Sequence, residues 1–435
     1  MISEKLSSWG NLSANLHDIE YIFSQKQAIN TIPHAPKKGL AFGNGRSYGD
    51  VPLNSNGLIW NMSGLSRFIS FDPEQAILHC EAGITLQEIH RVFNPLGWML
   101  PVTPGTLIPT VGGAIANDVH GKGHHSSGSF GDHLLYIKLL RTDGEIIECS
   151  RQHNADWFYA TIGGIGLTGV ILEAKLTMRK ITSTWIDAET IPFYHLDNFF
   201  TLSNSSEQAW EYSVSWIDCF SGKNSRGLFM RGNLSQETKP TPSPKERSFS
   251  IMPPISLVNG ISLPLFNFAY FNINRLKPRK QLIDFEPFFY PLDAIHDWNR
   301  MYGPKGFFQY QSVIPKEVGK VATDEMLKVI KKSGEGSFLG VLKTFGHSES
   351  GGLLSFPMKD GVTLALDFPN KGESTLRLFN LLDRIVEEAG GRLYLAKDAR
   401  MPKSLFEKGY PRIAEFLRFH DKGISSDLSR RLLGV

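Results

Sequence analysis

The sequence predicts an α+β fold of two domains, and three observations support this prediction. Its 435 residues exceed the roughly 250 to 300 residues at which a single hydrophobic core stops growing. Hydrophobic residues make up 41% and charged residues 20% of the chain, which excludes disordered and collagen-like proteins. Short strand patterns dominate the first part without the regular strand–helix alternation of a doubly wound sheet, so we expect a strand-rich α+β domain followed by a second sheet.

The first domain is expected at residues 1–181, and hydrophobic patterns define its elements. Apolar runs that begin at Leu58, Ala76 and Trp98 predict strands, with a short amphipathic helix, TLQEIHRVF, before the last of them. The runs LLYIKLLR and EIIECS flank Asp143-Gly144, which favours a hairpin because both residues tolerate positive φ. The run VILEAKLTMRKI predicts one more strand at the end of this domain.

Longer strand patterns and two helices indicate a second domain at residues 182–391. The strands are predicted at EYSVSWIDCF, GLFMRGN, FLGVLKTFG and VTLALDFP. Apolar residues at helical spacing from Leu378 to Ala389, followed by Gly390 where a C-cap is needed, predict a helix, and we expect the helices on one face of the sheet. Residues 235–280 are expected to contain a mobile loop, because 235–250 are rich in proline, serine and charge.

Charge and cysteine content exclude several classes of protein. The 46 basic and 43 acidic residues give a net charge of +3, too weak to indicate nucleic acid as a partner. Cys80, Cys149 and Cys219 have no CxxC spacing, so neither a disulfide framework nor a zinc cluster is indicated and a reducing compartment is the simpler interpretation. The N-terminal residues lack the apolar run of a secretory signal, so we expect a cytoplasmic protein.

Three glycine-rich segments carry the functional signal. The first, GNGRSYGD from Gly43, allows backbone N–H groups to point into one concavity that suits a pyrophosphate. Alone it is equally consistent with an ordinary turn, since it is neither a GxGxxG loop nor a Walker A loop. The second, residues 101–131, is too rich in glycine for a helix or a regular strand and is expected to wrap a ligand. The third, IGGIGLTG from Ile162, leads into a strand and allows a close approach of backbone or ligand.

Histidines of the second loop raise the alternative of a metal site. His120, His124 and His125 follow an HxGxHH pattern, which is not a standard ligand spacing, and only Asp118 and Asp132 are placed to complete a site. We therefore expect no metal.

Together the three segments resemble the flavin-binding domain of the vanillyl-alcohol-oxidase-type (PCMH-type) FAD oxidoreductases. The segments FFQYQSVIP, YPLD, SFLGVLKTFG, LDFP and GGRLYLAKDAR also resemble the branch of that family that oxidises polyprenyl-phosphoryl ribose, and the resemblance covers nearly the whole chain. It implies an FAD-binding domain at residues 1–181, completed by about 392–435, and a substrate domain with an antiparallel sheet at 182–391.

The resemblance also implies roles for single residues. FAD would be held by Gly43, Gly45, Arg46, Ser47, Tyr48, Gly49, Gly105, Thr106, Gly112, Gly113, Ala116, His120, Gly121, Gly166 and Tyr394. The substrate would be bound by Tyr48, Gln311, Lys343, Thr363, Ala365 and Lys397, and the catalytic roles would fall to Lys397, Lys122 and His120. A phosphodiester substrate needs cations and its reacting hydroxyl needs a base, although each lysine taken alone is more typical of a solvated surface.

Two of these positions depart from the family pattern. Thr363 and Ala365 stand where mycobacterial relatives have asparagine and cysteine, which affects the substrate pocket but leaves the flavin loops unchanged. Many relatives attach the flavin through a histidine of the first loop, and Arg46 occupies that place here, so we expect FAD to be bound without a covalent bond.

The implied activity is oxidation of a sugar secondary alcohol to a keto sugar, at C2 of a polyprenyl-phosphoryl-β-D-ribose-like substrate, as the first half of an epimerisation. A quinone or dioxygen would accept the electrons and a short-chain reductase would be the partner enzyme. Two alternatives stay open: a soluble sugar or alditol oxidase on the same fold, and a flavin-bearing scaffold subunit of a membrane sugar-transfer complex.

One uncharged segment bears on membrane contact. Residues 248–274 contain no charged side chain, and Arg275, Lys277, Arg279 and Lys280 follow at once. Prolines and asparagines within the segment exclude a continuous transmembrane helix. It is either an aromatic-rich part of the second core or a mobile lid on the inner face of the membrane, with its apolar side chains in the interface and its basic cluster on anionic headgroups.

Overall fold

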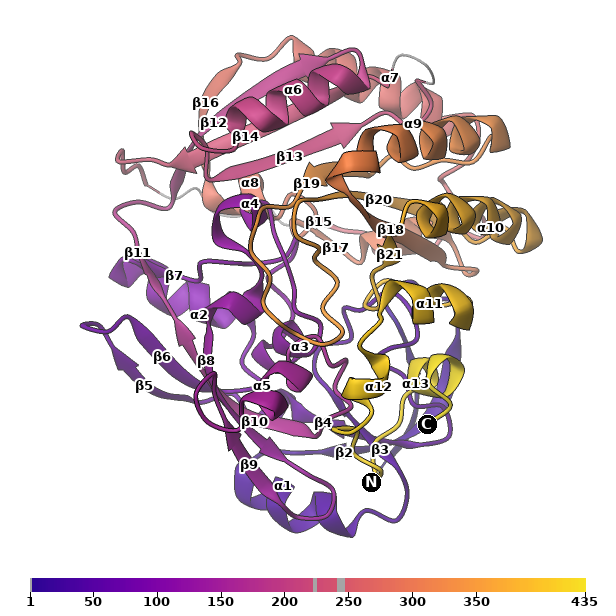
Figure 1. The fold of residues 1–435 in the computed structure, drawn as a ribbon. Helices are drawn as coiled ribbons and strands as arrows, with labels where there is room; N and C mark the ends of the chain where they lie inside the picture. Colours follow the sequence, from indigo (N-terminus) through magenta and orange to yellow (C-terminus); the bar gives the residue numbers. More distant parts are fainter. Residues whose placement is uncertain (1, 222–224, 241–246) are drawn as a thin grey trace.

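Two sheets form the N-terminal part of the chain in the computed structural model, which describes residues 2–221, 225–240 and 247–435 (Figure 1). One is four-stranded in the order β1-β2-β4-β3, and the other is five-stranded and antiparallel in the order β5-β6-β10-β8-β9. Their strands are β1 (Ile2–Ser7), β2 (Ala14–Tyr21), β3 (Gly39–Phe42), β4 (Leu58–Asn61), β5 (Phe68–Asp72), β6 (Ile77–Glu81), β8 (Leu134–Leu140), β9 (Ile146–Cys149) and β10 (Val170–Thr177). Gly144 has φ +89° between β8 and β9, which confirms the predicted hairpin.

Short helices accompany these sheets. They are α1 (Gln25–Thr31), α2 (Leu86–Phe93) and α5 (Ala155–Thr161), with 3₁₀ turns at Ile32–His34, Met62–Gly64, Asn94–Leu96 and Phe130–His133. The predicted helix α2 begins with a capping box, in which the Glu88 N–H donates to the Thr85 hydroxyl at 3.1 Å and the Thr85 N–H donates to the Glu88 carboxylate at 2.8 Å. Strands β7 (Trp98–Met99) and β11 (Arg179–Lys180) pair beside it.

The second sheet has eight antiparallel strands in the order β16-β12-β14-β13-β19-β20-β18-β21. They are β12 (Trp185–Phe193), β13 (Tyr212–Ile217), β14 (Gly227–Leu234), β16 (Lys280–Asp284), β18 (Phe307–Pro315), β19 (Gly340–Thr344), β20 (Gly361–Pro369) and β21 (Arg392–Leu393). Helices α6 (Leu196–Ser206), α9 (Lys316–Ser333) and α10 (Glu373–Glu388) cover its outer face (Figure 1). The α+β fold class is therefore confirmed.

Helix α10 forms as its apolar spacing predicts. Leu378, Leu382 and Val386 lie on its buried face, and Gly390 follows with φ +67°. Only a residue without a Cβ takes this left-handed conformation at low cost, which explains why the helix ends there.

Helix α7 (Ser262–Arg275) packs on the opposite face, which the sequence patterns did not predict. Its Phe271 clusters with Trp216 and Leu228, whereas Phe199 of α6 contacts Phe229. Leu228 and Phe229 are neighbours on a strand and so point to opposite faces. In the described part of the chain, no helix combines the length and apolar content needed to cross a bilayer.

The prediction that residues 101–131 contain no helix is wrong. Two short helices, α3 (Val111–Ala116) and α4 (His124–Ser127), interrupt this loop. Thr110 caps α3, because its hydroxyl accepts a hydrogen bond from the Gly113 N–H at 3.2 Å and offsets the cost of two glycines in one turn.

Residues 235–280 contain more regular structure than a loop. Besides α7, the described part includes β15 (Arg247–Ser248), which pairs with β17 (Ile295–His296), and the start of β16. Residues 241–246 lie outside the described residues, and mobility of this segment stays a prediction. The helix α8 (Phe285–Phe289) and the 3₁₀ turn at Trp298–Tyr302 follow.

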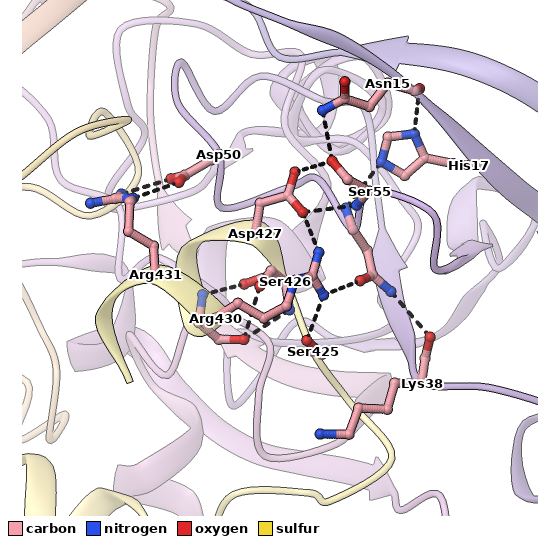
Figure 2. Close-up of polar contacts among 12 residues, drawn as sticks. Asn15, His17, Lys38, Asp50, Ser55, Ser425, Ser426, Asp427, Arg430 and Arg431 are labelled. Carbon is pink, nitrogen blue, oxygen red and sulfur yellow. Dashed lines mark hydrogen bonds and ion pairs between the residues drawn. The ribbon is translucent and has the colours of Figure 1, made fainter. Parts of the chain in front are cut away.

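The C-terminal segment returns to the N-terminal sheets through a cluster of matched charges, part of which is shown in Figure 2. Arg431 pairs with Asp50 at 2.8 Å and with Asp398 at 2.8 Å. Asp427 accepts from the Ser55 N–H at 2.8 Å and pairs with Arg430. We call these five charged residues the C-terminal clamp. The helices of this segment are α11 (Lys403–Gly409), α12 (Ile413–Phe416) and α13 (Asp427–Leu432).

Candidate active site

A cavity of about 390 Å³ lies between the glycine loops of the first domain and the inner face of the eight-stranded sheet. Most of the predicted site residues line it: Gly43, Gly45, Arg46, Ser47, Tyr48, Gly105, Thr106, Gly112, Gly113, Ala116, His120, Gly166, Gln311, Lys343, Thr363, Ala365, Tyr394 and Lys397. The cavity volume is in the range of small-molecule and cofactor sites.

Two other predicted glycines serve the packing of the chain and are not among the lining residues. A Cβ on Gly49 would overlap the carbonyl oxygen of Asp398, and a Cβ on Gly121 would overlap the carbonyl oxygen of Thr103. Both positions require glycine because two backbones meet there.

The first glycine loop is fixed from both sides. The Tyr48 N–H donates to the Ala396 carbonyl at 2.9 Å, and the Trp9 N–H donates to the Ser47 carbonyl at 3.0 Å. Gly45 has φ +57°, a conformation that favours glycine. The loop therefore presents a preformed edge to the cavity.

Room and unpaired polar atoms at this end of the cavity fit FAD. A Cβ on Gly105 or Gly166 would meet open space, so these glycines leave the cavity wide. Arg46 Nε, Asn117 Oδ1 and His120 Nδ1 are buried without a hydrogen-bond partner among the described residues. Buried polar atoms in this state are costly and are normally paired, so a polar ligand is the expected partner.

The opposite wall comes from alternate residues of three adjacent strands. Gln311 of β18 lies opposite Ala365 of β20, and Lys343 of β19 lies opposite Thr363. Because side chains alternate along a strand, all four point to the cavity face. Gln311 Nε2 lies 3.3 Å from Thr363 Oγ1, and Lys343 Nζ donates to the Gly121 carbonyl at 3.1 Å.

Lys397 completes this wall from the C-terminal segment. Its Nζ lies 3.8 Å from the centroid of the Tyr48 ring, a cation–π contact that joins the two halves of the site. Burial lowers the pKa of Lys397 and lowers the pKa of Lys343 to about 7. The like charge of Lys397 also lowers the pKa of Lys343, and neither ammonium forms an ion pair among the described residues.

His120 and Tyr394 stand where the two halves meet. His120 Nε2 lies 3.1 Å from Gln311 Nε2, and the Tyr394 hydroxyl donates to the Asn117 carbonyl at 2.8 Å. Burial and the nearby Lys343 hold the pKa of His120 well below its usual range, so its imidazole is neutral. A neutral His120 can donate or accept through either nitrogen.

Lys122 is not among the residues that line the cavity. Its ammonium donates to the Phe288 carbonyl of α8 and lies 4.8 Å from the centroid of the Phe288 ring. Burial lowers the pKa of Lys122 to about 7. His124 is buried against Phe345, with ring centroids 4.2 Å apart, and His125 Nε2 contacts the Trp210 carbonyl at 2.7 Å.

Sequence patterns missed several lining residues. Gln309 could have been found, because it lies two positions before Gln311 and so faces the same way. Asn117 belongs to the second glycine-rich segment and Asp293 ends the YPLD segment, so both also had a signal, whereas Trp9 and Trp298 had none. Asp293 accepts from the Leu107 N–H at 2.9 Å, which fastens the chain before β17 to the second glycine loop.

Comparisons with known proteins agree with this geometry. Residues 24–150 match the family described as FAD binding domain. The chain is 35% identical to decaprenylphosphoryl-beta-D-ribose oxidase of Mycolicibacterium smegmatis, over 99% of this chain and 97% of the relative. It is 28% identical to an uncharacterized protein of Streptomyces coelicolor, over 80% of this chain and 100% of the relative. Identity to the L-gulonolactone oxidase of Mus musculus is 31% over 32% of this chain and 31% of the relative.

Proposed function

The chain belongs to the FAD-dependent oxidoreductase family of decaprenylphosphoryl-beta-D-ribose oxidase, and on that premise we propose that it oxidises C2 of a polyprenyl-phosphoryl pentose to the 2-keto sugar. The observation that carries the proposal is the pairing of a glycine-lined cavity end with a wall that holds Lys343 and Lys397, neither of which forms an ion pair among the described residues. Such a wall suits an anionic substrate with a reacting hydroxyl.

The cavity residues have different proposed roles in the reaction. Bound FAD supplies a two-electron oxidant. Lys397, as a neutral amine, takes the proton of the reacting hydroxyl. Lys343 and Gln311 hold the phosphate and the sugar, and the neutral His120 fixes the Gln311 amide.

Anaerobic bleaching of the flavin tests the substrate class. A short-chain prenyl-phosphoryl ribose should bleach the yellow colour rapidly, whereas free ribose and an alditol should bleach it slowly or not at all. Equal bleaching by the alditol would favour a soluble sugar oxidase. No bleaching by any sugar would favour a scaffold subunit.

FAD is proposed to be held without a covalent bond. Arg46 lies over the Trp9 ring at 4.7 Å and its Nη1 donates to the Asn44 carbonyl at 2.7 Å, and a guanidinium is no nucleophile for the flavin. Acid precipitation should release all the flavin into the supernatant, and colour left in the pellet would refute this.

The apolar segment before β16 supports a peripheral membrane contact at the inner leaflet. Many of its large side chains are exposed: Ile251, Met252, Ile255, Leu257, Ile261, Leu265, Phe266, Phe268, Ile273 and Leu276. Large exposed apolar patches on a protein surface often mark sites of membrane or protein contact. Arg275, Lys277, Arg279 and Lys280 follow, and each basic residue near an anionic bilayer contributes about 1 kcal/mol.

This surface belongs to the cover of the cavity. Leu263 of α7 clusters with Trp298, which lines the cavity, and the Leu257 N–H donates to the Met301 carbonyl at 2.9 Å. A polyprenyl tail could therefore stay in the bilayer while its phosphosugar enters. Replacing the four basic residues by glutamine should weaken binding to anionic liposomes and leave activity on the short-chain substrate unchanged. Unchanged liposome binding would reject the membrane contact.

The reaction also needs an electron acceptor and a consumer of its product. We propose a quinone or dioxygen as acceptor and a short-chain reductase as the partner that completes the epimerisation. Reoxidation of the bleached protein by each acceptor, followed with a stopped-flow spectrophotometer, distinguishes the two acceptors.

A further inference from the structure

Asp367 is a buried carboxylate on the cavity side of the eight-stranded sheet. It follows Thr363 and Ala365 at two-residue steps on β20, so all three side chains point the same way. Its exposed fraction is 0%. Gln309, directly opposite on β18, donates from Nε2 to Oδ1 at 2.6 Å, but Oδ2 has no hydrogen-bond partner among the described residues.

A half-paired carboxylate in this position needs a nearby positive charge. An unpaired buried oxygen costs about 1–3 kcal/mol, and more when the group is charged. Burial raises the pKa of Asp367 to about 7, and the field of Lys397 opposes this shift and favours the ionised carboxylate. Asp367 in turn favours protonated Lys397. Gln309 links the two sides, because it hydrogen-bonds to Tyr48 as well as to Asp367, and Lys397 lies over the Tyr48 ring.

Other titratable groups around the pair do not supply this charge. Lys343 and His120 interact electrostatically with Lys397, and Tyr48 and Tyr302 interact in the same way with Asp367. Lys343 and Lys397 repel each other, and both tyrosines are neutral because burial raises their pKa. Asp367 is therefore the acidic group that acts on Lys397.

We propose that Asp367 is a positioning residue that serves as the buried counter-charge of Lys397. The proposal rests on the proposed function, in which Lys397 is the base. When the substrate O–H bond breaks, an N–H bond forms on Lys397 and the amine becomes an ammonium. The Asp367 carboxylate stabilises that ammonium, so the lysine keeps a proton affinity useful near neutral pH.

The test is the Asp367→Asn variant, which removes the charge and keeps an acceptor for Gln309. Without the carboxylate, the pKa of Lys397 falls further, so the acidic limb of the bleaching rate against pH should move down by at least one pH unit. The pH dependence of Lys397 acetylation by acetic anhydride, read by mass spectrometry, should move in the same direction. A purely structural carboxylate would move neither profile.

Two further variants separate the effect of Asp367 on Lys397 from a general loss of stability. Glu335, another buried carboxylate, bonds to Ser374 and Thr375 away from the cavity, so Glu335→Gln should leave both profiles in place. If Asp367→Asn does not fold, Gln309→Leu weakens the hold on the carboxylate and should shift both profiles the same way by less. Unmoved profiles in a folded variant would overturn the proposal. If wild-type flavin is not bleached, the proposed function fails, while the acetylation profile still decides the coupling.

Discussion

Buried charges follow opposite rules in the C-terminal clamp and in the cavity wall. In the clamp, Arg431 is shared by the two carboxylates of Asp50 and Asp398 (Figure 2 shows its bond to Asp50). In the wall, Lys343 and Lys397 form no ion pair among the described residues, and Asp367 acts on Lys397 without one. Matched charges hold two segments of the chain together, whereas unmatched charges destabilise the fold and are expected where a charged ligand binds.

The largest expected effect is on catalysis, at the unmatched end of this comparison. Lys397→Met keeps the length of the side chain and removes the base, so flavin bleaching by the short-chain substrate should slow by about 10²- to 10⁴-fold. FAD content should stay normal, because Lys397 lies on the substrate wall. Stopped-flow absorbance at saturating substrate measures this rate, and a rate within threefold of wild type would remove Lys397 from the role of base.

The clamp should respond in stability instead. Arg431→Met leaves Asp50 and Asp398 buried without their cation, and the free energy of unfolding should fall by about 3–5 kcal/mol. Burial raises the pKa of Asp50, so the loss should be smaller near pH 5, where an unpaired carboxyl is more readily protonated. Urea unfolding at pH 5 and pH 7.5 measures both effects. Equal losses at both pH values would show that the loss does not come from an uncompensated carboxylate.

The sequence predicted much of the site because its signals are local. Three adjacent lining residues of the first loop, Arg46, Ser47 and Tyr48, sit within one glycine-rich motif. Strand alternation explains why Gln311 and Ala365 face the same cavity. The helical spacing of α10 and the Asp-Gly hairpin were predicted for the same local reason.

Contacts between distant segments could not be predicted in this way. The proposed role of Asp367 depends on its interaction with Lys397, which lies on another segment of the chain. The clamp likewise joins residues separated by most of the chain. The loop of residues 101–131 contains helix α3 despite two glycines, because Thr110 caps it and tertiary packing overrides helix propensity. Helix α7 was missed because its apolar residues cover both its buried and its exposed sides.

A further variant reverses the sign of the stability effect. The pKa of folded Lys343, about 7, lies below the ordinary value of about 10.4. The unfolded chain therefore binds more protons between these values, and the folded state gains stability as pH rises through that window. Lys343→Met should raise the free energy of unfolding at pH 7 by about 1–3 kcal/mol and remove this gain, while substrate affinity falls. Urea unfolding from pH 7 to pH 10 checks it, and a destabilised variant would contradict it.

The smallest expected effect is that of a substitution at Lys122, a buried lysine outside the cavity wall. It is buried and donates to a backbone carbonyl, as Lys343 does, but it is not among the residues that line the cavity. Its partner is the Phe288 carbonyl of α8, so its contact supports the fold rather than the substrate wall. We expect Lys122→Met to slow flavin bleaching less than tenfold, because the side chain holds α8 rather than the substrate. Lys122→Arg, which keeps a donor for the carbonyl, is the control and should be nearer to wild type. A loss as large as that of Lys397→Met, with normal FAD content and stability, would return Lys122 to a catalytic role, since a contact that only supports α8 has no reason to govern the chemical step.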